Sequence, residues 1–125
     1  MSKERLRLGK CGEETAVKFL REQGYKIIAR NYRSRFGEID IIARDKDTLC
    51  FVEVKTRHSD RFGSPEEAVT GVKQKQIAKS ALSFLKERHL LDTKARFDVV
   101  SIVYSKDKPK TELIKDAFEL DARFR

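Results

Sequence analysis

The chain has 125 residues, of which 39% are hydrophobic and 38% charged, and its formal net charge is +8. This length supports one hydrophobic core, so we expect a single domain over residues 1–125. No apolar run approaches the roughly 20 residues of a membrane-spanning helix, and the N-terminal segment lacks the apolar core of a secretory signal. The sequence therefore predicts no membrane partner, and its positive charge favours a polyanion such as nucleic acid.

The two cysteines, Cys11 and Cys50, lie far apart in the sequence and lack the paired spacing of a zinc site. This arrangement suits a reducing compartment, in which free cysteines behave as small buried hydrophobic residues. We therefore expect a cytoplasmic protein in which both cysteines are buried.

The hydrophobic pattern predicts helices and strands in a mixed order. A first helix is expected over residues 10–23, with Gly24 as its stop, followed by strands at 25–32, 38–44 and 48–56. A second helical region starts at Ser64-Pro65-Glu66-Glu67, is interrupted at Thr70-Gly71 and runs to about Arg88. Strands at 96–104 and 112–118 complete the chain. This order predicts an α/β (α+β) fold with a central mixed five-stranded sheet flanked by helices.

Strands 38–44 and 48–56 are predicted to form a hairpin around Lys46-Asp47. Counting outward from that turn, Asp40 faces Glu53 and Glu38 faces Lys55. Because side chains alternate along a strand, the hairpin has two faces. One face is apolar throughout and the other carries the four charged residues beyond an apolar end; the apolar face consists of Ile39, Ile41, Ala43, Cys50, Val52 and Val54, and the other of Ile42, Leu49 and Phe51 with Glu38, Asp40, Glu53 and Lys55.

The pair Asp40 and Glu53 predicts a metal site. Opposed residues on paired strands have Cβ atoms roughly 4.5–5.5 Å apart, where like charges are destabilising. A divalent cation such as Mg²⁺ or Mn²⁺ removes that repulsion, activates water and leaves room for a phosphate. Lys55 can then orient the water or offset charge on the phosphate. The alternative is a charged solvent face, which the shared face with Phe51 argues against.

Glu13 is a further candidate acid. It lies on the same side of the first helix as Ala16, Val17 and Leu20, at spacings of three, four and seven residues. This side should face the sheet, which would bring a further carboxylate to the metal site. The alternative is an acid favoured only by the positive end of the helix dipole.

Three motifs resemble the signature of the bacterial YraN proteins. They are Gly12-Glu13, Gly37-Glu38-Ile39-Asp40-Ile41-Ile42-Ala43 and Phe51-Val52-Glu53-Val54-Lys55-Thr56-Arg57, and the match runs from about residue 9 to 104. That family is assigned to the PD-(D/E)XK nuclease superfamily, which has the restriction-endonuclease-like fold, and is similar in layout to archaeal Holliday junction resolvases.

The resemblance implies roles for residues of this chain. Asp40 and Glu53 become metal ligands, with the Val54 carbonyl as a third, Lys55 becomes the catalytic lysine and Glu13 the acid from the helix. Apart from the resemblance, the hairpin register places Glu38 opposite Lys55, where it would support the site either by holding Lys55 in place or by binding the metal. Other expectations are that Asp98 is structural and that phosphates are contacted by basic residues, which are Lys73 in the second helical region and Arg33, Arg35, Arg57 and Arg61 in two loops. For those arginines a solvated basic surface is the alternative.

The resulting hypothesis is a Mg²⁺- or Mn²⁺-dependent endonuclease that hydrolyses DNA phosphodiester bonds by metal-activated water. Branched or single-stranded DNA is favoured because the chain has no separate recognition domain. The alternative is a non-catalytic nucleic-acid-binding module on a nuclease fold, serving DNA repair, recombination or uptake, and RNA is a third possible substrate. A homodimer is expected by analogy alone, because two-fold pairing suits a symmetric junction.

Overall fold

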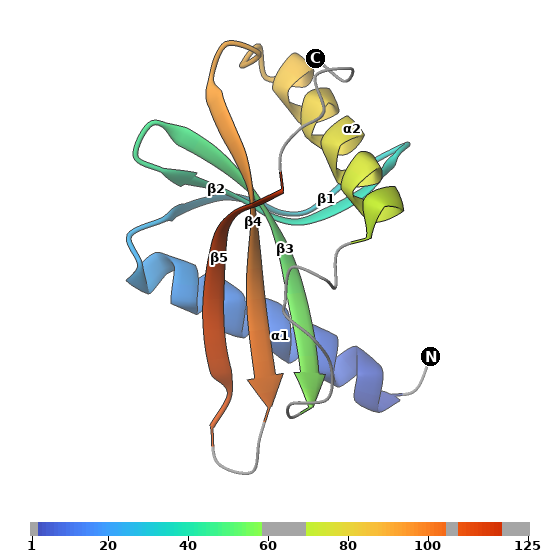
Figure 1. Cartoon of the computed structure of the whole chain (residues 1–125), viewed down its shortest axis with the longest axis vertical. Coiled ribbons are helices and arrows are strands. Elements are labelled where there is room, and N and C mark those ends of the chain that lie inside the picture. Colours follow the sequence, from blue (N-terminus) through green and yellow to red (C-terminus); the bar gives the residue numbers. More distant parts are fainter. Residues whose placement is uncertain (1–2, 59–69, 105–107, 119–125) are drawn as a thin grey trace.

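A computed structural model of the protein describes residues 3–58, 70–104 and 108–118, with the backbone alone at 3–10 and 58. The described chain folds into two helices and one five-stranded sheet (Figure 1). The elements in chain order are α1 (Lys3–Glu22), β1 (Lys26–Ser34), β2 (Gly37–Asp45), β3 (Thr48–His58), α2 (Gly71–Glu87), β4 (Lys94–Tyr104) and β5 (Lys110–Phe118). The predicted α+β fold with a mixed sheet is confirmed.

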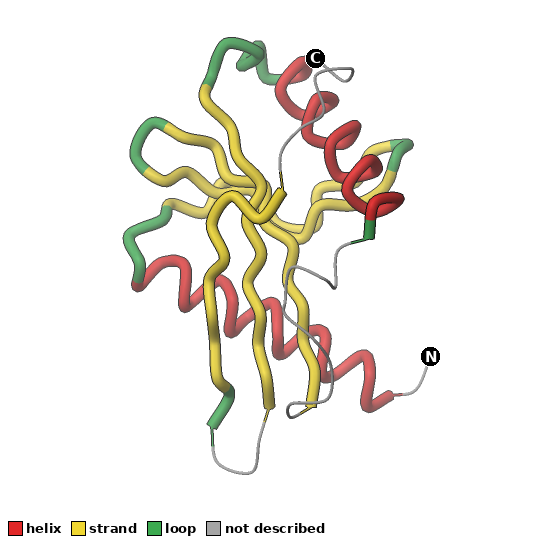
Figure 2. Tube along the Cα trace, viewed as in Figure 1, coloured by secondary structure: helices red, strands yellow, loops and turns green. Residues whose placement is uncertain are grey.

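The strands lie side by side in the order β1-β2-β3-β4-β5. All neighbours are antiparallel except β3 and β4, which are parallel. Parallel neighbours need a crossover connection, and the connection here contains α2. The helices cover opposite faces of the sheet: α1 crosses behind the long strands in Figure 1, while α2 lies against the other face (Figure 2).

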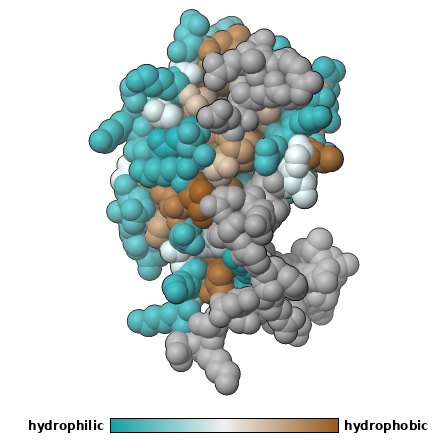
Figure 3. Space-filling model, in the orientation of Figure 1, coloured by the Kyte–Doolittle hydropathy of each residue, from teal (hydrophilic) through white to brown (hydrophobic). Residues whose placement is uncertain are grey.

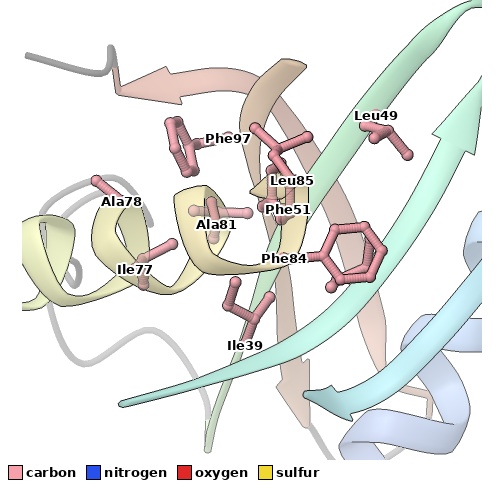
Figure 4. Close-up of a cluster of buried hydrophobic side chains, with 11 residues drawn as sticks. Ile39, Leu49, Phe51, Ile77, Ala78, Ala81, Phe84, Leu85 and Phe97 are labelled. Carbon is pink, nitrogen blue, oxygen red and sulfur yellow. The ribbon is translucent and has the colours of Figure 1, made fainter. Parts of the chain in front are cut away.

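The core on the α2 side is built around phenylalanine rings. Phe51 of β3 meets Phe84 of α2 edge-to-face, with ring centroids 6.0 Å apart, and lies 5.8 Å from Phe97 of β4. Aliphatic and alanine side chains fill the space between helix and sheet (Figure 4). Ile77, Ala81 and Leu85 of α2 are buried here.

The core on the α1 side is smaller and aliphatic. Ala16, Val17 and Leu20 of α1 are buried against strand residues that include Ile41 and Val52. These helix residues are those predicted to face the sheet, so that prediction is confirmed. The prediction for the cysteines was half right, because Cys50 is buried in this core whereas Cys11 is exposed.

Element boundaries differ from the prediction mainly at the helices. α1 begins at Lys3 rather than at residue 10. Its N-terminal part extends past the edge of the sheet (Figure 1), so a prediction based on the spacing of buried residues places the start of the helix too late. The predicted interruption at Thr70-Gly71 is where α2 begins: Thr70 is the N-cap, and its side chain accepts a hydrogen bond from the backbone N–H of Lys73. The helix start predicted at Ser64-Pro65-Glu66-Glu67 lies outside the described residues.

The hairpin of β2 and β3 has the predicted register near its turn and departs from it farther out. The pairs Ile42–Phe51 and Ile41–Val52 form as predicted, but the pairing ends there. The predicted oppositions of Asp40 with Glu53 and of Glu38 with Lys55 are therefore wrong as backbone pairs. Glu38 aligns instead with Arg33 on β1.

The strand faces also switch at this point. Ile39 joins Ile42 in the α2-side core, whereas Ile41 lies in the α1-side core, so the predicted placement of Ile39 with Ile41 is wrong. The neighbouring strand β1 is irregular at the same level, where Asn31, between Arg30 (paired with Ile41) and Tyr32 (paired with Ile39), has a positive φ of 52°. A left-handed residue inside a strand twists it and re-aims the side chains on either side.

The surface is strongly polar. Figure 3 shows the visible face covered mainly by hydrophilic side chains, with hydrophobic areas between them. Within the described part of the chain, no helix combines the length and apolar character needed to cross a membrane.

A buried ion-pair network joins the sheet to the chain segment after α1. Asp98 of β4 is fully buried and accepts hydrogen bonds from Arg96, from the backbone N–H of Asp116 and, at 3.4 Å, from the Tyr25 hydroxyl. Arg96 also contacts Asp45 at 2.8 Å. Burial, followed by the charge of Asp98, raises the pKa of Tyr25 well above its ordinary range. Asp98 is thus structural, as predicted.

We predict that Asp98→Ala lowers the free energy of unfolding by about 3–5 kcal/mol, because it removes a fully buried carboxylate and leaves the half-buried Arg96 and the Asp116 N–H without this partner. Urea denaturation followed by circular dichroism measures the change. The matched control is Asp47→Ala, which breaks an ion pair of Asp47 with Lys94 between two largely exposed side chains and should leave stability nearly unchanged. Equal losses in the two variants would contradict the prediction.

Candidate functional site

The candidate site begins where β2 and β3 separate. Just beyond the last pair, Ile41 and Val52, the Asp40 carboxylate accepts a hydrogen bond of 2.8 Å from the backbone N–H of Val54. The side chain of Asp40 thus accepts a hydrogen bond from the β3 backbone at a point where the β2 backbone no longer pairs with β3. Glu53, next to Val54, is 4% exposed. A backbone pair is absent, yet the two predicted acids still share one site.

Two lysines compensate the buried charge of Glu53. Lys73 Nζ lies 2.8 Å from Glu53 Oε1, and Lys55 Nζ lies 3.8 Å from the same oxygen. Lys73 belongs to the first turn of α2, where its backbone N–H is held by the Thr70 cap. Burial alone would lower the pKa of Lys73, but the hydrogen bond and charge of Glu53 outweigh it and raise this pKa.

The environment of Asp40 disfavours its charged form. Burial, followed by the negative charge of Glu53, raises the pKa of Asp40 to about 7 from an ordinary value of 3.8. The Val54 N–H and Lys73 oppose this shift without cancelling it, and the charge of Glu13 adds to it. A positive charge close to this carboxyl group would stabilise its charged form and lower its pKa.

Glu13 of α1 contributes a third acid near Asp40. Its Oε1 atom is buried, and no hydrogen-bond partner for this atom is present among the described residues. A buried carboxylate oxygen without a partner is costly. The cost would be removed by a bound cation or water at this oxygen.

Gly12 explains how α1 comes close enough to place Glu13. A Cβ atom added at Gly12 would overlap the Cγ2 methyl group of Thr56 on β3. The helix and the strand are therefore in direct contact at this point, and only glycine fits. From the sequence, Gly12 was known only as part of the motif Gly12-Glu13. A glycine inside a helix costs about 1 kcal/mol relative to alanine, so its position in the helix was a signal of close packing.

The donor atoms fit a hard divalent cation in kind. Asp40, Glu53 and Glu13 offer carboxylate oxygens, the ligands that Mg²⁺ and Mn²⁺ prefer. The Val54 carbonyl, the predicted third ligand, belongs to the residue whose N–H binds Asp40. Across residues 3–58, 70–104 and 108–118, however, no three Asp, Glu, His or Cys side chains converge as a finished ligand set. In this arrangement the lysines on Glu53 supply the positive charge.

The predicted phosphate-binding residues are distributed around this site. Arg33 is 81% exposed and lies 3.8 Å from Glu38, so Glu38 contacts Arg33 and not Lys55 in the described structure. Arg35 lies at the tip of the β1–β2 hairpin, and Arg57 is half-buried on β3. Arg61 lies outside the described residues. Lys73, expected as a phosphate contact, binds Glu53, a partnership that sequence reasoning missed.

Comparisons with known proteins identify the relatives of this chain. A family model described as "Uncharacterised protein family UPF0102" matches residues 12–102. A UPF0102 protein of Syntrophus aciditrophicus is 53% identical over 117 residues, covering 94% of this chain and 92% of the relative. One from Geobacter metallireducens is 52% identical over 120 residues, covering 96% and 98%. These matches confirm the predicted resemblance to the YraN proteins.

We predict that Gly12→Ala lowers the free energy of unfolding by about 1–3 kcal/mol, because the new methyl group overpacks the contact with Thr56. Thr56→Ser removes the Cγ2 methyl group, so the double variant should recover most of the loss. Gly71→Ala is the matched control, since an added Cβ there meets nothing within 4 Å. Thermal and urea unfolding measure the stability of the parent, the two single variants, the double variant and the control. A double variant no more stable than Gly12→Ala would rule out this contact as the cause.

We predict that Asp40→Asn changes how stability depends on pH. The raised pKa of Asp40, about 7, means that the folded state keeps a proton which the unfolded state releases above its own pKa near 4. The parent therefore loses stability as pH rises from about 4 to about 7, and the loss persists above pH 7. Asparagine still accepts from Val54 but carries no charge, so the variant should be more stable than the parent at pH 8, by roughly 2–4 kcal/mol.

Urea denaturation in EDTA at pH 4.5 and pH 8 tests this difference. The two proteins should have similar stability at pH 4.5, where Asp40 is protonated. Asp47→Asn, at an exposed acid, controls for the loss of one negative charge. A variant-to-parent difference that does not depend on pH would show that Asp40 is not held in its neutral form.

Proposed function

The chain belongs to the uncharacterised protein family UPF0102, and on that premise we propose that it is a metal-dependent endonuclease. The reaction is hydrolysis of DNA phosphodiester bonds, with Asp40, Glu53, Lys55 and Lys73 at the site. Mg²⁺ or Mn²⁺ is the proposed cofactor, and Glu13 is an additional acid.

One observation carries this proposal: the buried Glu53 and the half-buried Asp40 share one site where β2 and β3 separate. Glu53 is 4% exposed, and its charge helps to raise the pKa of Asp40 to about 7. Like charges held together in a protein interior reduce stability. Clustered acids with shifted pKa values, together with lysines, are typical of sites where chemistry takes place.

The residues have complementary roles in this reaction. A bound divalent cation would supply a Lewis acid for the phosphate and would lower the pKa of the attacking water. Asp40 and Glu53 would hold that cation, which would require Lys73 to leave Glu53. Lys73 is 40% exposed and lies on a helix end, from which it can move to a phosphate oxygen. Lys55, 28% exposed, stays beside Glu53 and offsets negative charge that develops on the phosphate.

Composition supports DNA as the polyanion. A net charge of +8 attracts a phosphate backbone at long range, and the exposed Arg33 lies on the hairpin beside α2. Branched or single-stranded DNA is the favoured substrate and RNA the alternative. A homodimer and a cytoplasmic location remain predictions.

The ion pair of Lys73 with Glu53 favours a second candidate function. At 2.8 Å this contact satisfies Glu53 without a metal. A protein that retained this pair permanently would be a nucleic-acid-binding module on a nuclease fold, without cutting activity, in DNA repair, recombination or uptake.

We predict cleavage of branched or single-stranded DNA with Mg²⁺ or Mn²⁺, and none with EDTA. Glu53→Gln and Lys55→Met should each reduce the cleavage rate about a hundredfold or more, since Glu53 would hold the cation and Lys55 offsets charge that develops on the phosphate. Labelled junction, flap and single-stranded DNA, resolved on denaturing gels, measure the rate. Asp47→Asn is the matched control, because it changes an exposed acid at the turn end of the same hairpin.

Binding of the same DNA in EDTA separates the two candidate functions. If DNA binds in a salt-dependent manner but no substrate is cut with either metal, the binding module is supported. If Glu53→Gln cuts as fast as the parent, the assigned site is wrong. Circular dichroism of each variant ensures that a loss of cutting is not a loss of folding.

A further inference from the structure

The tip of the β1–β2 hairpin carries an aromatic ring flanked by two cations. The guanidinium carbon of Arg35 lies 4.8 Å from the centroid of the Phe36 ring, and Lys79 Nζ of α2 lies 5.8 Å from it. Both distances are those of cation–π contacts. Phe36 is half-buried, both cationic side chains are exposed, and the ring packs into neither core cluster of the described chain.

The hairpin tip is attached to α2 by side-chain hydrogen bonds. The hydroxyl groups of Ser34 and Ser80 lie 2.8 Å apart, and Ser80 is fully buried. Ser34 also accepts a hydrogen bond of 3.1 Å from the backbone N–H of Phe36. Gly37, with φ of 145°, lets the chain turn back close to the side chain of Gln76. The ring is thus presented from a braced turn, which reduces the entropy lost when a ligand binds.

The same helix connects this ring to the candidate active site. Lys79 touches Phe36 and Lys73 touches Glu53, and both belong to α2. Six residues of α-helix span about 9 Å, which corresponds to roughly two or three nucleotides at the spacing of one strand. A strand whose phosphate lies at Glu53 therefore has a base within reach of Phe36.

We propose that Phe36, with Arg35 and Lys79, is a stacking platform for an unpaired base of the nucleic acid. An aromatic face flanked by cations fits a nucleotide, because the base stacks on the ring while long basic side chains turn to the neighbouring phosphates. Bases inside a duplex have their faces covered, so the platform selects single-stranded or branched segments. Its position relative to the cut rests on the proposed nuclease function, whereas base stacking itself does not.

Phe36→Trp provides a direct optical test, because the chain contains no tryptophan and the new residue is the single reporter. Titration with a single-stranded thymidine oligonucleotide in EDTA should quench its emission to saturation. A blunt DNA duplex of equal length should not quench it. Unchanged emission at oligonucleotide concentrations that saturate binding, measured by anisotropy of labelled DNA, would overturn the proposal.

Phe36→Leu tests the energetic part. It should weaken binding of the single-stranded oligonucleotide about 5- to 150-fold, the range of losses when an aromatic side chain that stacks on one base is truncated. Binding of the duplex should be unchanged. The slope of affinity against salt should stay the same, because no phosphate contact is removed. Leu91→Ala, at an exposed hydrophobic residue after α2, is the matched control and should bind like the parent.

Two further outcomes would overturn the proposal. One is parental affinity of Phe36→Leu for single-stranded DNA; the other is a change in sedimentation with no change in DNA binding, which would assign Phe36 to contact with a second copy of the chain. Failure of the nuclease proposal is distinguishable, because stacking is measured in EDTA without cleavage. Saturable quenching without any cutting would refute only the nuclease, whereas cutting by a protein that shows no quenching would refute only the platform.

Discussion

The site depends on one hydrogen bond that replaces a backbone pair. β2 and β3 stop pairing after Ile41 and Val52, and the Asp40 carboxylate takes up the N–H of Val54. This contact ties the two strands together where they separate. It also keeps Asp40 beside the buried Glu53, so that structural support and electrostatic repulsion are found in the same residue.

The two helices place further charged side chains beside Asp40 and Glu53. The N-terminal turn of α2 brings Lys73 to Glu53, and the positive end of the helix dipole adds to the favourable charge there. On the opposite face, Gly12 lets α1 touch β3 at Thr56, which brings Glu13 Oε1 into the interior, where it has no hydrogen-bond partner among the described residues. One helix thus offsets the acidic charge and the other increases it.

Local patterns predicted the fold well and the end of the hairpin poorly. Alternation correctly predicted the pairs next to the turn, because a two-residue turn sets the register of a hairpin. The prediction failed from Asp40 outward. There β2 and β3 no longer pair, Asp40 binds the Val54 N–H, and Ile39 lies in the α2-side core apart from Ile41. Regular alternation along one strand does not predict where its pairing with another strand ends.

The sequence by itself determined the strands and helices, the α+β class, the structural role of Asp98, and the motifs that contain Asp40, Glu53, Lys55 and Glu13. Periodicity and short motifs depend on neighbours along the chain, so they can be read directly. Only the tertiary structure decided that Lys73 binds Glu53, that Glu38 contacts Arg33 and that Phe36 lies between Arg35 and Lys79. Except for the adjacent Arg35 and Phe36, these contacts join residues of different elements, and their partners depend on how closely and at what angle those elements pack.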